Sequence, residues 1–277
     1  MNFNNVFNEI EKVDADVYDR FDTRRTAMKN FARFSGKLAL TAIPLALGSM
    51  FKKAYAGTTG TLETAVEILN YALTLEYLES EFYIMGLAQA PIPAGAARGA
   101  IEIISKHESA HVVFLTNAIK AAGGTPGAKP AFDFTAGGAF ANVFTSYPTF
   151  LAVAQVFEDT GVRAYKGRAA ELVKGGDLLT AALNIHSVEA RHAAHIRSMR
   201  KANNFGDAKP WITGKDTTGI GSAVQASYNG EENTIQANIQ ITNINGMAIT
   251  ANAASEAFDE GLSKDAVLAI VKPFIKA

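Results

Sequence analysis

Two four-residue stretches, Glu108-Ser109-Ala110-His111 and Glu189-Ala190-Arg191-His192, repeat the pattern Glu-x-x-His. Side chains at positions i and i+3 of an α-helix lie on one face, so each stretch can aim a carboxylate and an imidazole at one point. One such pair is a weak signal, whereas two pairs in separate helical segments are much harder to obtain by chance. The pattern therefore predicts two helices with metal-binding faces.

Apolar residues recur with a helical period around both stretches and also in two further segments. We expect four long helices, at residues 61–87, 95–122, 146–174 and 177–202. Asp177 is expected to cap the fourth helix. Residues 123–144 are rich in glycine and proline, so they form a long connection between the second and third helices. Two short links and one long one predict an all-α, ferritin-like four-helix bundle with a long crossover.

The first and third helices each carry a glutamate at a matching distance from a Glu-x-x-His stretch. Glu76 precedes Glu108 by 32 positions, and Glu158 precedes Glu189 by 31. A glutamate from each of two helices plus Glu-x-x-His from each of the other two is the ligand set of di-iron and di-manganese carboxylate proteins. Four carboxylates balance two divalent ions, and oxygen and imidazole ligands suit iron or manganese. We expect two metal ions, iron first and manganese second, bound by Glu76, Glu108, His111, Glu158, Glu189 and His192.

Several neighbours of these ligands are candidates for supporting roles. Tyr83 and Tyr165 each follow a ligand glutamate by two helical turns and fit either redox participation or core packing. Glu79 lies one turn from Glu76 and could replace it as the ligand. His186 lies near the His192 pair and could support it. His107 points away from Glu108 and is expected to be a surface or packing residue.

The alternative for the whole set is a bundle that keeps these polar residues but has lost its metal. Four carboxylates gathered in an apolar interior would repel one another strongly without cations. A site without metal would be expected to shed them, which favours metal binding.

Residues 61–203 resemble the ferritin-like superfamily through the motifs above. Leu73-Thr74-Leu75-Glu76-Tyr77-Leu78-Glu79 and Phe258-Asp259-Glu260-Gly261-Leu262-Ser263-Lys264-Asp265 further resemble exported bacterial ferritin-like, desiccation-related proteins. The resemblance implies a bundle that holds two metals between its helices, with dioxygen, peroxide or ferrous iron as reactants. It also implies that the four glutamates and two histidines named above are the ligands.

Residues 1–56 have the pattern of an export signal. Thr23-Arg24-Arg25-Thr26-Ala27-Met28-Lys29 precedes an uncharged stretch at 38–51, which is shorter than the roughly 20 residues of a membrane-spanning helix. Ala54-Tyr55-Ala56 then offers a small-x-small cleavage site. The paired arginines resemble a twin-arginine signal, although Ala27 stands where an aromatic residue is usual. We expect a periplasmic or otherwise exported protein; the alternative is an amphipathic helix that stays on the chain.

Residues 204–277 differ from the bundle, which we place at 57–203. Apolar residues alternate with polar ones from Ile235 to Ile241, and Asn245-Gly246 is a strong signal for a two-residue hairpin turn. Ser263 fits the N-cap of a short helix that runs to about Lys272. This extension is predicted to be a β-hairpin and a short helix that cover apolar surface.

The composition narrows the function classes. The chain has 277 residues, 48% of them apolar, a net charge of −1 and no cysteine, so it is globular, lacks thiolate sites and has no basic field for nucleic acid. The first hypothesis is an exported di-iron oxidase that oxidises ferrous iron or consumes peroxide or oxygen. The alternatives are a manganese catalase and a non-catalytic metal-binding or desiccation-stress protein. We expect no stable membrane span after removal of the signal, and a small homo-oligomer rather than a cage.

Overall fold

The computed structural model describes residues 64–244 and 246–276. The predicted export signal at 1–56 lies outside these residues. Over the described residues, none of the helices combines the length and apolar character needed to cross a membrane.

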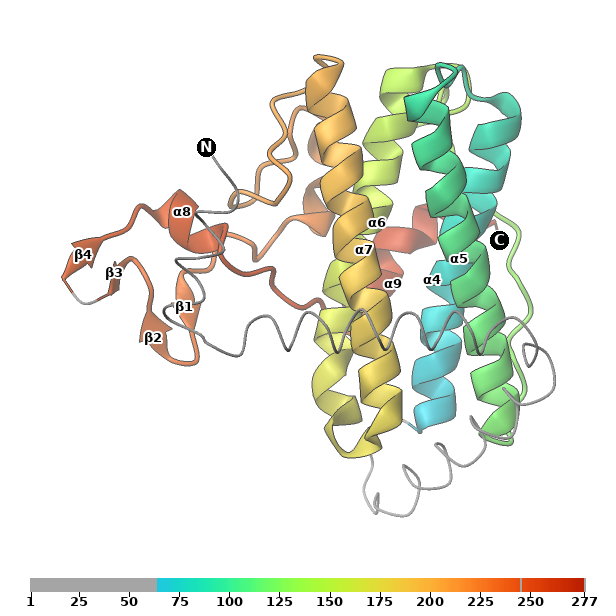
Figure 1. Ribbon diagram of the computed structural model, residues 1–277, viewed down its shortest axis with the longest axis horizontal. Helices are drawn as coiled ribbons and strands as arrows, with labels where there is room; N and C mark the ends of the chain where they lie inside the picture. Colours follow the sequence, from blue (N-terminus) through green and yellow to red (C-terminus); the bar gives the residue numbers. More distant parts are fainter. Residues whose placement is uncertain (1–63, 245, 277) are drawn as a thin grey trace, which may run out of the picture. The chain divides into compact units, whose positions relative to one another are not determined.

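Four long helices run side by side and form the bundle (Figure 1). They are α4 (Ala65–Gln89), α5 (Ala96–Ala121), α6 (Tyr147–Ala169) and α7 (Asp177–Ala202). α4 packs mainly against α5, and α6 against α7, while the long crossover joins the two pairs. The predicted all-α bundle is confirmed.

The helix ends follow local chemistry, with two differences from the sequence prediction. α4 starts after Thr64, whose side chain and that of Glu67 form a reciprocal capping box. α6 gives way to a 3₁₀ helix, η1 (Ala170–Gly175), so the third α-helix is shorter than expected. Asp177 is the first helical residue and not the cap, because Gly176 occupies the cap position with a positive φ of 52°.

The crossover between α5 and α6 is hydrogen-bonded to residues near the end of the chain. Phe132 pairs with Ile275 in an isolated antiparallel bridge, and the Asp133 amide donates to the Phe274 carbonyl at 2.8 Å. Phe274 also packs edge-on against Phe157 of α6. Residues near the end of the chain therefore pack between the crossover and α6.

The extension after α7 contains two small hairpins, where the sequence predicted one. Its elements are η2 (Ser222–Ser227), β1 (Ile235–Gln236), β2 (Ile239–Gln240), β3 (Asn243–Ile244), β4 (Met247–Ala248), α8 (Ala251–Ser255), α9 (Lys264–Val271) and η3 (Lys272–Phe274). β1 pairs with β2, and β3 with β4, both antiparallel. Ala237 and Asn238 have positive φ angles of 50° and 65°, so the chain turns in the middle of the expected strand. Its alternating pattern does not mark a buried face, since Ile235 and Ile239 are exposed.

The end of the extension packs on α6. Ser263 caps α9, as the sequence predicted, and the flanking Leu262 and Val267 are both buried. α9 contacts α6, and the Leu262 amide donates to the Arg163 carbonyl at 3.0 Å. A Cβ on Gly167 would meet the Leu262 carbonyl oxygen at 1.9 Å, so only glycine allows this approach. α6 is consequently buried on nearly all sides.

Candidate metal centre

Six side chains from the four bundle helices meet in the interior, and we call them the carboxylate cluster. They form two groups of four residues. In each group, one ligand atom from each residue lies within 4.8 Å of the others. The first group is Glu76, Glu108, His111 and Glu189, and the second is Glu108, Glu158, Glu189 and His192. The structure therefore brings together all six residues that the sequence suggested as ligands.

Two of the carboxylates face both groups. Glu108 places Oε2 at 3.2 Å from His111 Nδ1 and Oε1 at 2.8 Å from His192 Nδ1. Glu189 does the same, with Oε1 at 3.2 Å from His111 Nδ1 and Oε2 at 3.9 Å from His192 Nδ1. Each of the two carboxylates thus spans both groups, which is the arrangement of bridging ligands.

The other two glutamates each belong to one group. Glu76 Oε2 lies 3.1 Å from His111 Nδ1, and Glu158 Oε2 lies 3.3 Å from His192 Nδ1. The cluster therefore has an approximate twofold arrangement, in which each group has one imidazole, one glutamate of its own and two shared glutamates.

The cluster is buried but not satisfied. All four glutamates have no exposed surface. Several of their oxygens and one imidazole nitrogen have no hydrogen bond of good geometry among the described residues: Glu108 Oε1, Glu158 Oε2, Glu189 Oε1 and Oε2, and His192 Nδ1. Buried acceptors that face one another repel unless a cation or a proton lies between them. The donor set of oxygen and imidazole atoms fits divalent iron or manganese.

Burial perturbs the ionisation of these groups strongly. Burial, opposed by the hydrogen bond from His111, raises the pKa of Glu76 to about 7. Burial together with the charge of Glu76 raises the pKa of Glu189 to about 8. Burial alone would lower the pKa of His192, but the charge of Glu158 and the hydrogen bond to Glu108 raise it to about 10. Without cations the cluster therefore holds protons that these residues would otherwise release.

Two tyrosines support the unshared glutamates across the bundle. Tyr83 on α4 donates to Glu158 Oε1 on α6 at 2.5 Å, and Tyr165 on α6 donates to Glu76 Oε1 on α4. The sequence placed each tyrosine on the same face as its own helix's glutamate, whereas the hydrogen bonds cross to the opposite helix. Burial raises the pKa of both phenols well above the usual value, so they stay protonated as donors.

Glu79 lies beside the cluster without joining either group. A Cβ on Gly161 would lie 3.1 Å from Glu79 Oε1 and 3.5 Å from Glu189 Oε2, so the glycine leaves room for both carboxylates. Burial, followed by the charge of Glu189, raises the pKa of Glu79 well above its usual value. Glu79 is therefore a buried carboxyl group next to a shared ligand candidate.

The remaining histidines divide into one that reaches the cluster and two that do not. His107, expected at the surface, is exposed, but its Nδ1 lies 2.9 Å from His192 Nε2. A neutral His192 that offers Nδ1 to a metal carries its proton on Nε2, which then donates to His107. His186 instead bonds the Val162 carbonyl at 3.0 Å, and His195 is exposed. The sequence signal for this role of His107 is its position directly before the ligand candidate Glu108.

The sequence matches the family described as Ferritin-like domain over residues 64–202. The chain belongs to the ferritin-like family. No curated protein and no solved structure matches it at a significant level. The ferritin-like match begins at the cap of α4 and ends with α7, so it covers the carboxylate cluster and leaves out the extension.

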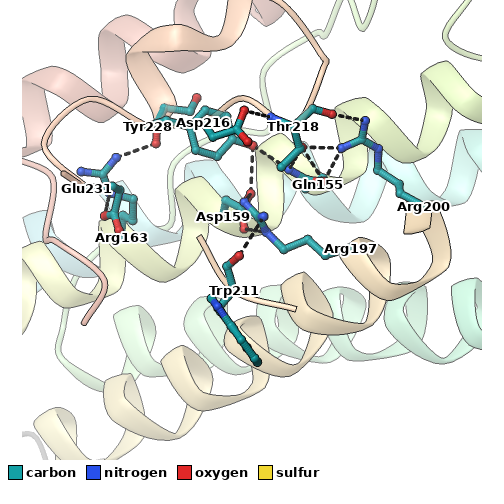
Figure 2. Close-up of polar contacts among 11 residues, drawn as sticks. Gln155, Asp159, Arg163, Arg197, Arg200, Trp211, Asp216, Thr218, Tyr228 and Glu231 are labelled. Atoms are coloured by element: carbon teal, nitrogen blue, oxygen red, sulfur yellow. Dashed lines mark hydrogen bonds and ion pairs between the residues drawn. The ribbon is translucent and has the colours of Figure 1, made fainter. Parts of the chain in front are cut away.

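The ferritin-like domain meets its extension through a second buried polar cluster, which we call the extension cluster (Figure 2). It comprises Gln155, Asp159, Arg163, Arg197, Arg200, Thr218, Tyr228 and Glu231. Arg197 binds both oxygens of Asp159, at 2.8 and 2.6 Å, and Tyr228 donates to Asp159 at 2.9 Å.

The rest of the extension cluster is built in the same way. Arg163 pairs with Glu231 at 2.7 Å and donates to the carbonyls of Ser227 and Asn229. Arg200 donates to the Gln155 side chain. Gln155, Asp159 and Arg163 follow one another at intervals of four on α6, so they share one helix face, and this spacing is the signal for the extension cluster in the sequence.

Proposed function

We propose that the carboxylate cluster binds two metal ions and that the protein oxidises ferrous iron with dioxygen or peroxide. The observation that carries this proposal is the pair of shared glutamates, each of which offers one oxygen to each group. Four carboxylates would neutralise two divalent ions, and among the described residues the ion pairs of these glutamates are all with His111 or His192.

The residues have distinct tasks in this scheme. Glu108 and Glu189 would hold the two ions at a fixed separation, and Glu76 and Glu158 would each complete the coordination of one ion. Tyr83 and Tyr165 each hold one oxygen of those two glutamates, while the other oxygen faces His192 or His111. Dispersed negative charge favours the higher oxidation state, so the ligand set lowers the free energy of ferric relative to ferrous iron.

The electron balance requires two iron atoms in each reaction. Two ferrous ions give one electron each to dioxygen, which takes up two protons and leaves as hydrogen peroxide. With peroxide as the oxidant, the same two electrons and two protons yield two water molecules. A pair of adjacent sites thus avoids release of a one-electron oxygen radical.

Anaerobic loading with ferrous iron, followed by addition of oxidant, tests the proposal. We expect about two irons per chain to be oxidised in a rapid phase, as in other two-metal sites. His111→Ala should abolish the rapid phase, whereas His195→Ala, which changes an exposed histidine on α7, should leave it intact. Oxidation no faster than in protein-free buffer would refute the proposal. Oxygen release from peroxide by manganese-loaded protein would favour a catalase instead.

We also propose that the protein is exported by the twin-arginine route, as an exported, desiccation-related member of the family. Support comes from Arg24 and Arg25 before the uncharged stretch at 38–51. Replacement of both arginines by lysine should trap the protein in the cytoplasm, as cell fractionation would show. Unchanged export of that variant would refute the twin-arginine assignment.

A further inference from the structure

The two ends of the bundle interior are filled differently. On one side of the carboxylate cluster, aromatic rings pack closely: Phe82 stacks on Phe150 at 4.9 Å and meets Phe157 edge-on at 5.1 Å. On the other side, towards the start of α4 and α7, the interior holds a small cavity of about 30 Å³. A cavity of about 10–15 Å³ accommodates one water molecule, so this cavity suits a very small molecule.

The wall of the cavity is almost entirely carbon. All four bundle helices and η1 contribute to it, with side chains that include Ile68, Ala72, Leu115, Ala164, Leu178 and Ala182. A water molecule needs two to four polar partners to be held in a protein interior, whereas apolar cavities stay dry and take up apolar atoms and small molecules. Tyr71 and Arg168 also line the cavity, but almost all of its exposed wall is carbon, so it favours a small apolar species over water and hydrogen peroxide.

The cavity ends against the carboxylate cluster. Its wall includes Tyr165, whose hydroxyl donates to Glu76. It also includes Leu75, the neighbour of Glu76, and Leu115, one helical turn beyond His111. Two lining residues, Phe114 on α5 and Ala182 on α7, are only half-buried, so this part of the cavity wall lies close to the bundle surface.

We propose that this cavity is a binding site for dioxygen, which it delivers to the Glu76–His111 side of the carboxylate cluster. Dioxygen is a small, apolar reactant that the proposed oxidation would consume, and it fits both the volume and the carbon lining. The inference rests on the proposed function for its purpose, but binding of dioxygen to the cavity can be measured without any metal.

Dissolved dioxygen is paramagnetic and speeds the relaxation of nearby methyl groups, so NMR of the metal-free full chain tests binding directly. Under raised oxygen pressure, the methyl groups of Ile68 and Leu178 should relax faster than those of Ile101 and Leu151, which are fully or nearly fully buried elsewhere in the bundle. Equal effects at all four residues would overturn the proposal, whatever the iron chemistry of the protein.

A filled cavity tests the delivery step. Ala182→Leu places a larger side chain in the wall, while Ala194→Leu makes the same change at another half-buried position of α7 outside the cavity. We expect Ala182→Leu to abolish the excess relaxation and to slow dioxygen-driven iron oxidation by about fivefold, as an access step would. Peroxide-driven oxidation by this variant, and both reactions of Ala194→Leu, should stay unchanged.

The outcomes separate the two proposals. Slowing of the dioxygen and peroxide reactions by the same factor in Ala182→Leu would overturn the cavity's role in delivery. Failure of the unmodified protein to oxidise iron with either oxidant would refute the proposed function, while the relaxation data would still decide whether the cavity binds dioxygen.

Discussion

Glu158 and Asp159 are neighbours on α6, yet they belong to two buried clusters that balance charge in different ways. In the extension cluster, Arg197 binds both oxygens of Asp159, and Arg163 pairs with Glu231. In the carboxylate cluster, four buried glutamates face only two imidazoles, and several acceptors lack a hydrogen bond of good geometry.

The difference shows how a structural cluster can be told from a binding site. Where the chain supplies its own counter-charge, polar burial joins one element to another, as it joins α6 and α7 to the extension. Where the chain gathers four carboxylates with only two imidazoles to balance them, it keeps a cost that only an added cation or proton relieves.

Arg197→Met should strongly destabilise the protein while leaving the ligand residues in place. The substitution removes one partner of a buried pair and leaves the Asp159 charge uncompensated, which costs about 3–5 kcal/mol. The free energy of unfolding, measured with urea, should fall by that amount, and metal content per folded chain should not change. Arg191→Met, at an exposed position of α7, should change stability by about 0.5 kcal/mol or less. Comparable effects for both variants would contradict the structural role.

Metal-free protein should lose stability as the pH rises from 6 to 9. The folded pKa of Glu189 is about 8 and that of Glu76 about 7, above their usual value of 4.5, and that of His192 is about 10, above 6.5. The folded state therefore binds more protons than the unfolded state, and its advantage is lost as these protons leave.

Each such proton is worth about 1.4 kcal/mol per pH unit, so we expect the unfolding free energy of the metal-free protein to fall by several kcal/mol over this pH range. Urea unfolding with a chelator at pH 6 and at pH 9 measures the change. Metal-loaded protein should not show it, because the ions take the place of the protons. A pH dependence that is the same with and without metal would contradict the charge imbalance assigned to the carboxylate cluster.

Glu158→Gln should have opposite effects on the two states of the site. Removal of one like charge should stabilise metal-free protein at pH 8 by about 1–2 kcal/mol, since the amide oxygen can still accept from Tyr83. The same variant should bind less metal, as elemental analysis would show. Glu81→Gln, which removes a carboxylate paired with Lys129 near the surface, should do neither. Destabilisation of metal-free Glu158→Gln would contradict the prediction.

His107→Ala should have the smallest effect and should touch one half of the site only. Loss of the hydrogen bond to His192 Nε2 should weaken one of two metal-binding steps by about tenfold. The step that involves His111 should be unchanged, because Val188 occupies the matching position before Glu189. Isothermal titration calorimetry separates the two steps, and equal weakening of both would contradict the asymmetry.

The four helices and the candidate ligands could be predicted from the sequence alone. Glu-x-x-His spacing and the helical period are local properties, because the backbone geometry of a helix fixes which side chains share a face. The matching positions of Glu76 and Glu158 then sufficed to place six residues on four inward faces, and the structure brings those six together.

The way in which these helix faces meet depends on the tertiary structure. In the tertiary structure, Glu108 and Glu189 are the shared carboxylates. Tyr83 and Tyr165 donate their hydrogen bonds to glutamates on the opposite helix, and His107 lies next to His192. The expected strand near Ala237 is broken into a separate hairpin, and the extension packs on α6. Apart from the local turn at Ala237, these features depend on contacts between residues far apart in the chain, whose geometry is set by packing and burial and leaves no periodic trace in the sequence.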